Sequence, residues 1–191
     1  MIPPDLLLEA YCRGIFPMAM EDGEIGWFSP DPRAIIPVEG FHVPHGLQRA
    51  LRKGRFEIRI DTAFARVMRE CAAREETWIS EEIIGSYCEL HRRGFAHSVE
   101  AWADGKLEGG LYGVSLGAVF FGESMFHRAT DASKVALCGL IERMRANGFQ
   151  MLEVQWLTPH LKTFGAIEVS RADYMKRLAR CLGEACEFPA K

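Results

Sequence analysis

The sequence lacks the features that mark three common classes of protein. No apolar run reaches the roughly 18 residues that a membrane helix needs, and the first residues lack the basic and apolar regions of a secretory signal. The six cysteines contain no CxxC pair, so we expect buried thiols rather than zinc ligands or disulfides. We therefore expect a cytoplasmic protein that contacts no membrane and holds no metal.

Charge is distributed unevenly along the chain. The net charge is -3 over 191 residues, yet residues 41–60 carry five basic side chains against one acid, Glu57. The basic residues that concern us most are His45, Arg49, Arg52 and Lys53, in a segment with helical spacing. Such a face is commonly only solvated, but without balancing acids it also suits contact with nucleic acid.

Hydrophobic spacing predicts an α+β fold. We expect helices at about 5–13, 44–53, 80–94, 133–147 and 171–182, and another that Asp61 caps and that runs to about residue 71. Strands are expected at 96–103, 106–114, 118–123 and 149–156, the first three as an antiparallel meander. The proline-rich residues 1–40 form a small N-terminal lobe in this interpretation, and residues 41–191 form the main domain.

Three polar residues stand out in the predicted sheet. Alternation places Glu153 and Gln155 on one face of a strand. Either this face is exposed to solvent, or the two side chains are a pair of reactive groups. Glu123 lies among large apolar residues, where an unpaired carboxylate is costly. It either pairs with Arg128, accepts backbone N–H groups, or serves as the counter-charge for a cationic substrate.

The segment 131–134 predicts a helix start with an unusual charge. Asp131 and Ser133 are most simply helix caps. Lys134 then lies near a helix N-terminus, where the helix dipole does not favour a cation. This mismatch is a small indication of an anionic partner.

Separated motifs occur in the order found in one family. The sequence resembles leucyl/phenylalanyl-tRNA–protein transferases over about residues 5–178, in motifs at 14–17, 27–33, 77–79, 97–100, 109–114, 121–126, 132–134 and 155–165. The resemblance implies transfer of leucine, phenylalanine or methionine from aminoacyl-tRNA to acceptor proteins that begin with Arg or Lys. This transfer marks the acceptors for N-end-rule degradation. It also implies an acetyltransferase-superfamily-like (GNAT-like) catalytic domain, no cofactor and a monomeric protein.

Roles for individual residues follow from the same resemblance. Gln155 stands at the position of the catalytic glutamine and Glu153 at a catalytic acid that is usually aspartate. The remaining implied residues are Leu111, Phe120, Glu123 and Met125 in the amino-acid pocket, His45, Arg49, Arg52 and Lys53 at the tRNA, and Trp78 and Tyr87 near the site. Acceptor charge would be read by acids such as Glu123 or Glu153.

Departures from the family pattern leave alternatives open. Glu153 replaces aspartate, Met18 replaces a tryptophan, and the chain has no glycine-rich segment before its first helix. The changed acid allows altered acceptor specificity, including N-terminal Asp or Glu. An acyl-CoA-dependent N-acetyltransferase is a rival, although residues 127–133 lack the glycines of a pyrophosphate loop. The second rival is a non-catalytic tRNA-binding protein, a function that would leave the pair Glu153 and Gln155 unexplained.

Overall fold

The computed structural model describes residues 1–188; residues 189–191, with which the expected main domain ends, lie outside the described part. The N-terminal part contains α1 (Pro4–Cys12) and a hairpin of β1 (Phe16–Ala19) and β2 (Ile25–Phe28). The following elements are β3 (Arg33–Pro37), η1 (Val38–Gly40), α2 (His45–Arg52), β4 (Glu57–Ile60), α3 (Phe64–Ala72), α4 (Glu81–Arg92), β5 (Ala96–Ala103), β6 (Lys106–Leu116) and β7 (Val119–His127). The chain continues with α5 (Ala132–Ala146), β8 (Met151–Gln155), α6 (Pro159–Lys162), β9 (Ile167–Val169) and α7 (Arg171–Leu182).

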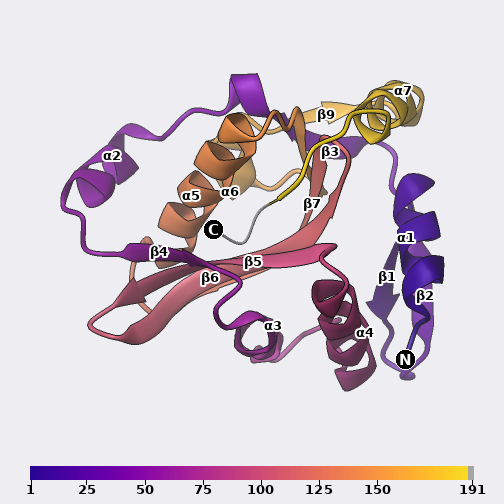
Figure 1. Ribbon diagram of the computed structural model, residues 1–191, viewed down its shortest axis with the longest axis horizontal. Helices are drawn as coiled ribbons and strands as arrows, with labels where there is room; N and C mark the ends of the chain where they lie inside the picture. Colours follow the sequence, from indigo (N-terminus) through magenta and orange to yellow (C-terminus); the bar gives the residue numbers. More distant parts are fainter. Residues whose placement is uncertain (189–191) are drawn as a thin grey trace.

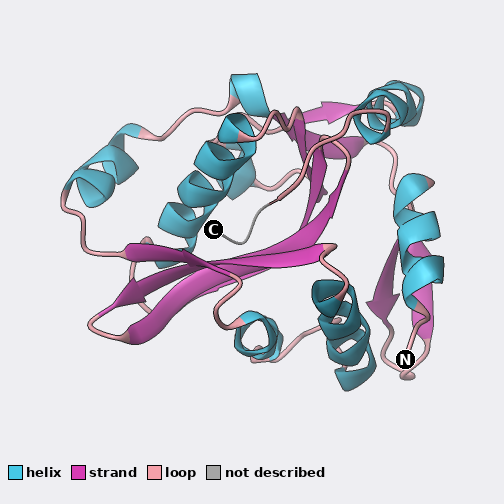
Figure 2. Ribbon diagram, in the orientation of Figure 1, coloured by secondary structure: helices cyan, strands magenta, loops and turns pink. Residues whose placement is uncertain are grey.

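A seven-stranded mixed sheet organises the molecule, in the order β4-β5-β6-β7-β8-β3-β9. The long strands β5, β6 and β7 form the expected antiparallel meander, and β8 joins β7 in parallel. A parallel partner requires a crossover, and α5 supplies it. The predicted α+β class is therefore confirmed (Figure 2).

Helices cover both faces of the sheet, and each face has its own core (Figure 1). On one face α5 packs against residues such as Leu111 and Phe120, and α2 is anchored beside it by Leu47. On the other face α3 and α4 cover Tyr112 and Phe121. Successive strand residues alternate between the two cores, as a strand covered on both faces requires. No helix within residues 1–188 is long and apolar enough to cross a membrane.

The strand β3 lies in the main sheet, although the sequence predicted residues 1–40 as a separate lobe. It pairs with β8 through Ile35 and Ile36 and with β9 through Arg33. The sequence does not predict this strand, because the prolines on either side of it favour turns or irregular extended backbone. Of the three strands in residues 1–40, β1 and β2 form a separate two-stranded sheet. The division into two domains stays a prediction.

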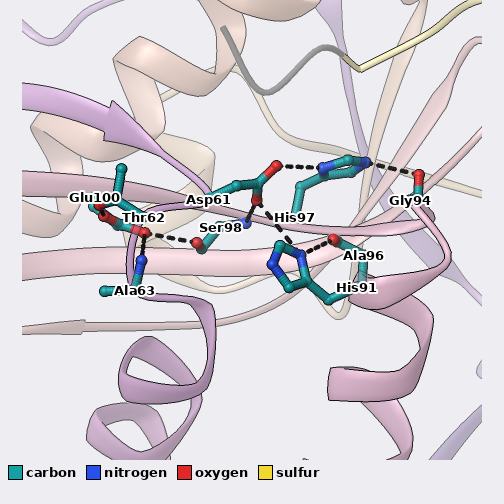
Figure 3. A network of polar contacts seen from close by, with 9 residues as sticks. All are labelled: Asp61, Thr62, Ala63, His91, Gly94, Ala96, His97, Ser98 and Glu100. Carbon is teal, nitrogen blue, oxygen red and sulfur yellow. Dashed lines mark hydrogen bonds and ion pairs between the residues drawn. The ribbon is translucent and has the colours of Figure 1, made fainter.

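Asp61 does not cap α3 as expected. It adopts a left-handed φ of 58°, and its carboxylate accepts the Ser98 N–H at 2.8 Å and lies 2.8 Å from His97 Nδ1 (Figure 3). The start of α3 is instead held by Glu100 of β5, which accepts the Ala63 N–H at 2.7 Å and also contacts Thr62 (Figure 3). These long-range bonds fix α3 to the sheet.

We expect Asp61→Ala to lower the free energy of unfolding by about 3 kcal/mol, because it leaves the Ser98 N–H and the buried His97 without their acceptor. Urea denaturation measures the loss. The matched control is Asp104→Ala in the turn between β5 and β6, which also removes an aspartate at positive φ, 50°. Equal losses in the two variants would show that backbone strain, and not the polar network, sets the cost.

Candidate active site

A cavity opens where β7 and β8 separate. Their parallel pairing ends at Phe121 and Glu153, and a space of about 340 Å³ lies beyond it. Its walls are mostly apolar, with Leu111, Met125, Leu137, Leu140, Leu152, Val154 and Leu161. Glu123 of β7 and Gln155 of β8 bring polar groups to the same space. The arrangement is an apolar recess with a polar wall.

A buried ion pair lies behind this wall. Arg33 Nε is 2.9 Å from Glu153 Oε1, and the two side chains are 1% and 0% exposed. The guanidinium also donates to the Gly14 carbonyl at 2.7 Å and stacks over the Tyr174 ring at 4.5 Å. Burial raises the pKa of Glu153, and the charge of Arg33 opposes that rise. Glu153 does not line the cavity, and a role for it in reading acceptor charge stays a prediction.

Gln155 has a strained backbone at the end of β8. Its φ is +61°, and the Trp156 N–H donates to the Val154 carbonyl at 2.8 Å, which closes a three-residue turn around it. Such γ-turns with positive φ are rare and strained. The Gln155 N–H donates to Glu153 Oε1 at 2.6 Å. Glu153 thus steadies the backbone of Gln155, while the buried side-chain Nε2 has no partner within residues 1–188.

Glu123 is the acid in the cavity wall. Burial raises its pKa to about 8, although the Tyr11 hydroxyl donates to Oε1 at 2.6 Å and favours the charged form. Within the described residues Oε2 has no partner, and neither has the Tyr112 hydroxyl, which lines the same cavity. Of the alternatives for Glu123, pairing with Arg128 is not found, because Arg128 binds Glu70 at 2.6 Å. Buried polar atoms without partners suit a ligand with both donors and acceptors.

The other predicted pocket residues divide into two groups. Leu111 and Met125 line the cavity. Phe120 does not: it is fully buried in the core, with its ring 5.2 Å from that of Phe188. Tyr87 reaches the site through its hydroxyl, which contacts that of Tyr11. Trp78 lies outside the cavity lining, where its carbonyl accepts the Ala19 N–H and joins α3 and α4 to the N-terminal hairpin.

The chain is similar to known proteins over nearly its whole length. The family described as leucyl/phenylalanyl-tRNA protein transferase matches residues 35–179, and its N-terminal domain matches residues 1–31. A leucyl/phenylalanyl-tRNA–protein transferase from Herpetosiphon aurantiacus is 58% identical over 98% of this chain and 98% of its own length. One from Akkermansia muciniphila is 55% identical over 96% and 97%.

The chain belongs to the leucyl/phenylalanyl-tRNA protein transferase family. This is a family of aminoacyltransferases, and the resemblance found in the sequence motifs is confirmed. Among solved structures, that of L-PGS from Bacillus licheniformis has a TM-score of 0.50 at 10% identity, covering 95% of this chain and 71% of that one. At this identity the likeness concerns the fold alone.

The candidate tRNA-binding residues form one exposed surface. His45, Arg49 and Arg52 lie on α2 and Lys53 follows it, and none of the four pairs with an acid within residues 1–188. Leu47 faces inward and anchors the helix, as its spacing predicts. Figure 1 places α2 at the opposite end of the molecule from α1 and the β1–β2 hairpin.

Sequence reasoning missed two residues that organise this transferase-family site. Arg33 ends the motif at 27–33, which assigns it no role, and Tyr11 lies outside the motifs. A signal for Arg33 exists, since an arginine directly precedes the apolar run Ala34–Ile36 and a buried cation requires an acid. Within residues 1–188, no three His, Cys, Asp or Glu side chains converge in a way that could hold a metal ion.

Titration of Glu123 makes the stability of the protein depend on pH. Its folded-state pKa of about 8 exceeds the value near 4.3 of an unfolded glutamate, so the folded protein retains a proton that the unfolded chain has lost. This contribution to stability is complete below about pH 4 and is lost as pH rises through about 8. We expect the stability of wild type relative to Glu123→Gln to fall by up to about 1.4 kcal/mol per pH unit in that window. Urea denaturation between about pH 5 and 9 measures it, with exposed Glu168→Gln as the control; a flat difference would contradict the assignment.

Proposed function

We propose that this protein transfers leucine, phenylalanine or methionine from aminoacyl-tRNA to the N-terminal Arg or Lys of acceptor proteins. The transfer forms a peptide bond and marks the acceptor for N-end-rule degradation. The observation that carries the proposal is the apolar cavity lined by Gln155, Glu123 and Tyr112, each of which has a buried polar atom without a partner within residues 1–188. The parallel β7–β8 pair that separates around this cavity supports the acetyltransferase-superfamily-like fold, and we take the protein to act as a cytoplasmic monomer.

The cavity suits the side chain of the transferred amino acid. Its volume of about 340 Å³ is at the small end of ligand pockets, which span about 300–1,000 Å³. Leucine, methionine and phenylalanine all bury apolar surface against such walls. The flexible Met125 can adapt to side chains of different shape. An apolar pocket separates these three amino acids weakly, because each methylene is worth only about 1–3 kcal/mol.

Peptide-bond formation needs positioning more than strong catalysis here. The ester of aminoacyl-tRNA is already activated, and the attacking N-terminal amine has a pKa near 8 in a free peptide. The amine nitrogen attacks the ester carbonyl, the bond to the ribose oxygen breaks, and the proton from the amine passes to that oxygen. Gln155 accepts a hydrogen bond from the amine and orients it, and Glu153 is a positioning residue that acts through the Gln155 backbone.

Glu123 supplies the negative charge in the cavity. It is protonated below about pH 8 in the free protein, and an ammonium group beside its unpartnered oxygen would displace that proton. Because Glu153 is committed to Arg33, its replacement of the usual aspartate does not by itself alter how acceptors are read. The structure thus supplies no specific support for acceptors that begin with Asp or Glu.

The proposal is tested with radiolabelled leucyl-tRNA and peptides that begin with Arg, Lys, Asp or Ala. We expect label to enter only the Arg and Lys peptides, and Gln155→Ala to lower kcat about 100-fold through loss of the oriented amide. Gln155→Gly is the backbone control, because glycine adopts a positive φ without strain. Recovery of full activity in the glycine variant would refute a role for the amide. Label in the Asp peptide would redirect the assignment of acceptors.

The exposed basic surface of α2 is tested through salt dependence. We expect Arg49→Gln combined with Arg52→Gln to weaken tRNA binding and to reduce the slope of log affinity against log salt by about 1.5. The reason is that the double variant makes fewer phosphate contacts and therefore releases fewer counterions from the tRNA when it binds. Arg92→Gln, an exposed cation at the end of α4, serves as the control. An unchanged slope in the double variant would remove α2 from the tRNA interface.

A further inference from the structure

A second hollow adjoins the apolar cavity at the start of α5. Its volume is about 680 Å³, and it shares Arg74, Met125 and His160 with the cavity wall. Its lining includes three cations, Arg74, Arg128 and Lys134. Two acids, Glu70 and Asp131, and His127 also line it. The sequence singled out Lys134 as a cation at a helix N-terminus, and the proposed transfer reaction does not use it.

The start of α5 has no cap of its own. Asp131 occupies the cap position in a left-handed conformation, and its carboxylate makes no cap hydrogen bond. It binds Lys134 Nζ at 2.8 Å instead, so the expected capping roles of Asp131 and Ser133 are wrong. The backbone N–H groups of Ser133 and Lys134 have no acceptor within residues 1–188. Unpaired N–H groups at the start of a 15-residue helix attract anions.

A buried serine in the wall of the hollow points to a ligand independently of the helix. Ser133 is only 5% exposed and lines the hollow. Among residues 1–188 its hydroxyl makes no hydrogen bond, and its oxygen is not one of the fully enclosed polar atoms, so it is accessible to a ligand in the hollow. A hydroxyl next to free backbone N–H groups is a donor set that suits the oxygens of a phosphate group.

The charge of the hollow favours an anion. Arg74 donates to Ser124 Oγ at 2.9 Å and to the Met125 carbonyl at 3.0 Å, so its contacts are with neutral acceptors and its charge is not cancelled. Lys134 and Arg128 have acidic partners, but these pairs are partly exposed and bind weakly in water. Both cations can therefore turn to a phosphate at little cost.

We propose that this hollow binds a phosphate group, namely the 5′-phosphate of the terminal tRNA nucleotide whose ribose carries the amino-acid ester. The assignment rests on the proposed function, because the ester then lies at Gln155 and the phosphate one ribose away. The shared Arg74 and His160 connect the two spaces along that path. The same chemistry would also suit a soluble diphosphate such as coenzyme A, and the test separates the two sources.

Two minimal donors test the proposal: adenosine carrying phenylalanine on its 3′ oxygen, with and without a 5′-phosphate. We expect the phosphorylated donor to have about tenfold higher kcat/KM with an Arg peptide, a gain that one charge-assisted contact provides. In Ser133→Ala and in Lys134→Gln this ratio falls to about one. Lys106→Gln, which changes an exposed cation at the start of β6, leaves the tenfold ratio intact.

The outcomes are distinguishable. Equal use of both donors by the wild type overturns the phosphate site and leaves the proposed transfer reaction standing. Failure of both donors and of leucyl-tRNA overturns the transfer reaction and the site with it. Binding of coenzyme A that depends on Lys134 and is tighter than binding of the phosphorylated donor overturns the RNA assignment. Weaker binding of coenzyme A, together with the tenfold ratio, supports the proposal.

Discussion

The site depends on one buried ion pair, between Arg33 and Glu153. Arg33 belongs to β3, Glu153 to β8, and the same guanidinium contacts Gly14 and the Tyr174 ring. The pair therefore holds together the N-terminal elements, the centre of the sheet and α7. It also supplies a carboxylate for the Gln155 N–H, which keeps the last residue of β8 in its strained turn. Removing either partner would leave an uncompensated group in the core.

Gln155 and Glu123 line the same cavity, so under the proposed function the sheet itself would orient the reacting groups. Both residues lie where the β7–β8 pairing ends, so backbone geometry rather than a flexible loop fixes their separation. Tyr11 of α1 donates to Glu123 and brings the N-terminal part of the chain into the same network. The main domain and the N-terminal elements thus build the site jointly.

The sequence predicts the meander, the crossover helix and the polar pair on β8, because these rest on local spacing. It could not predict that Glu153 faces Arg33, since this contact joins positions far apart on a strand concealed between prolines. The packing of Phe120 over Gly113 and against Phe188 also depends on contacts between distant residues, and its role in the amino-acid pocket stays a prediction. Asp61 looks like a cap locally, yet residues of β5 bind it.

The most direct test is a double-mutant cycle with Arg33→Met and Glu153→Gln, read as free energies of unfolding in urea. We expect Arg33→Met alone to be strongly destabilising, because it leaves a buried carboxylate without its partner, and we expect the addition of Glu153→Gln to recover part of the loss. The coupling energy should exceed about 1 kcal/mol. Losses that simply add would contradict the claim that this pair holds the site together.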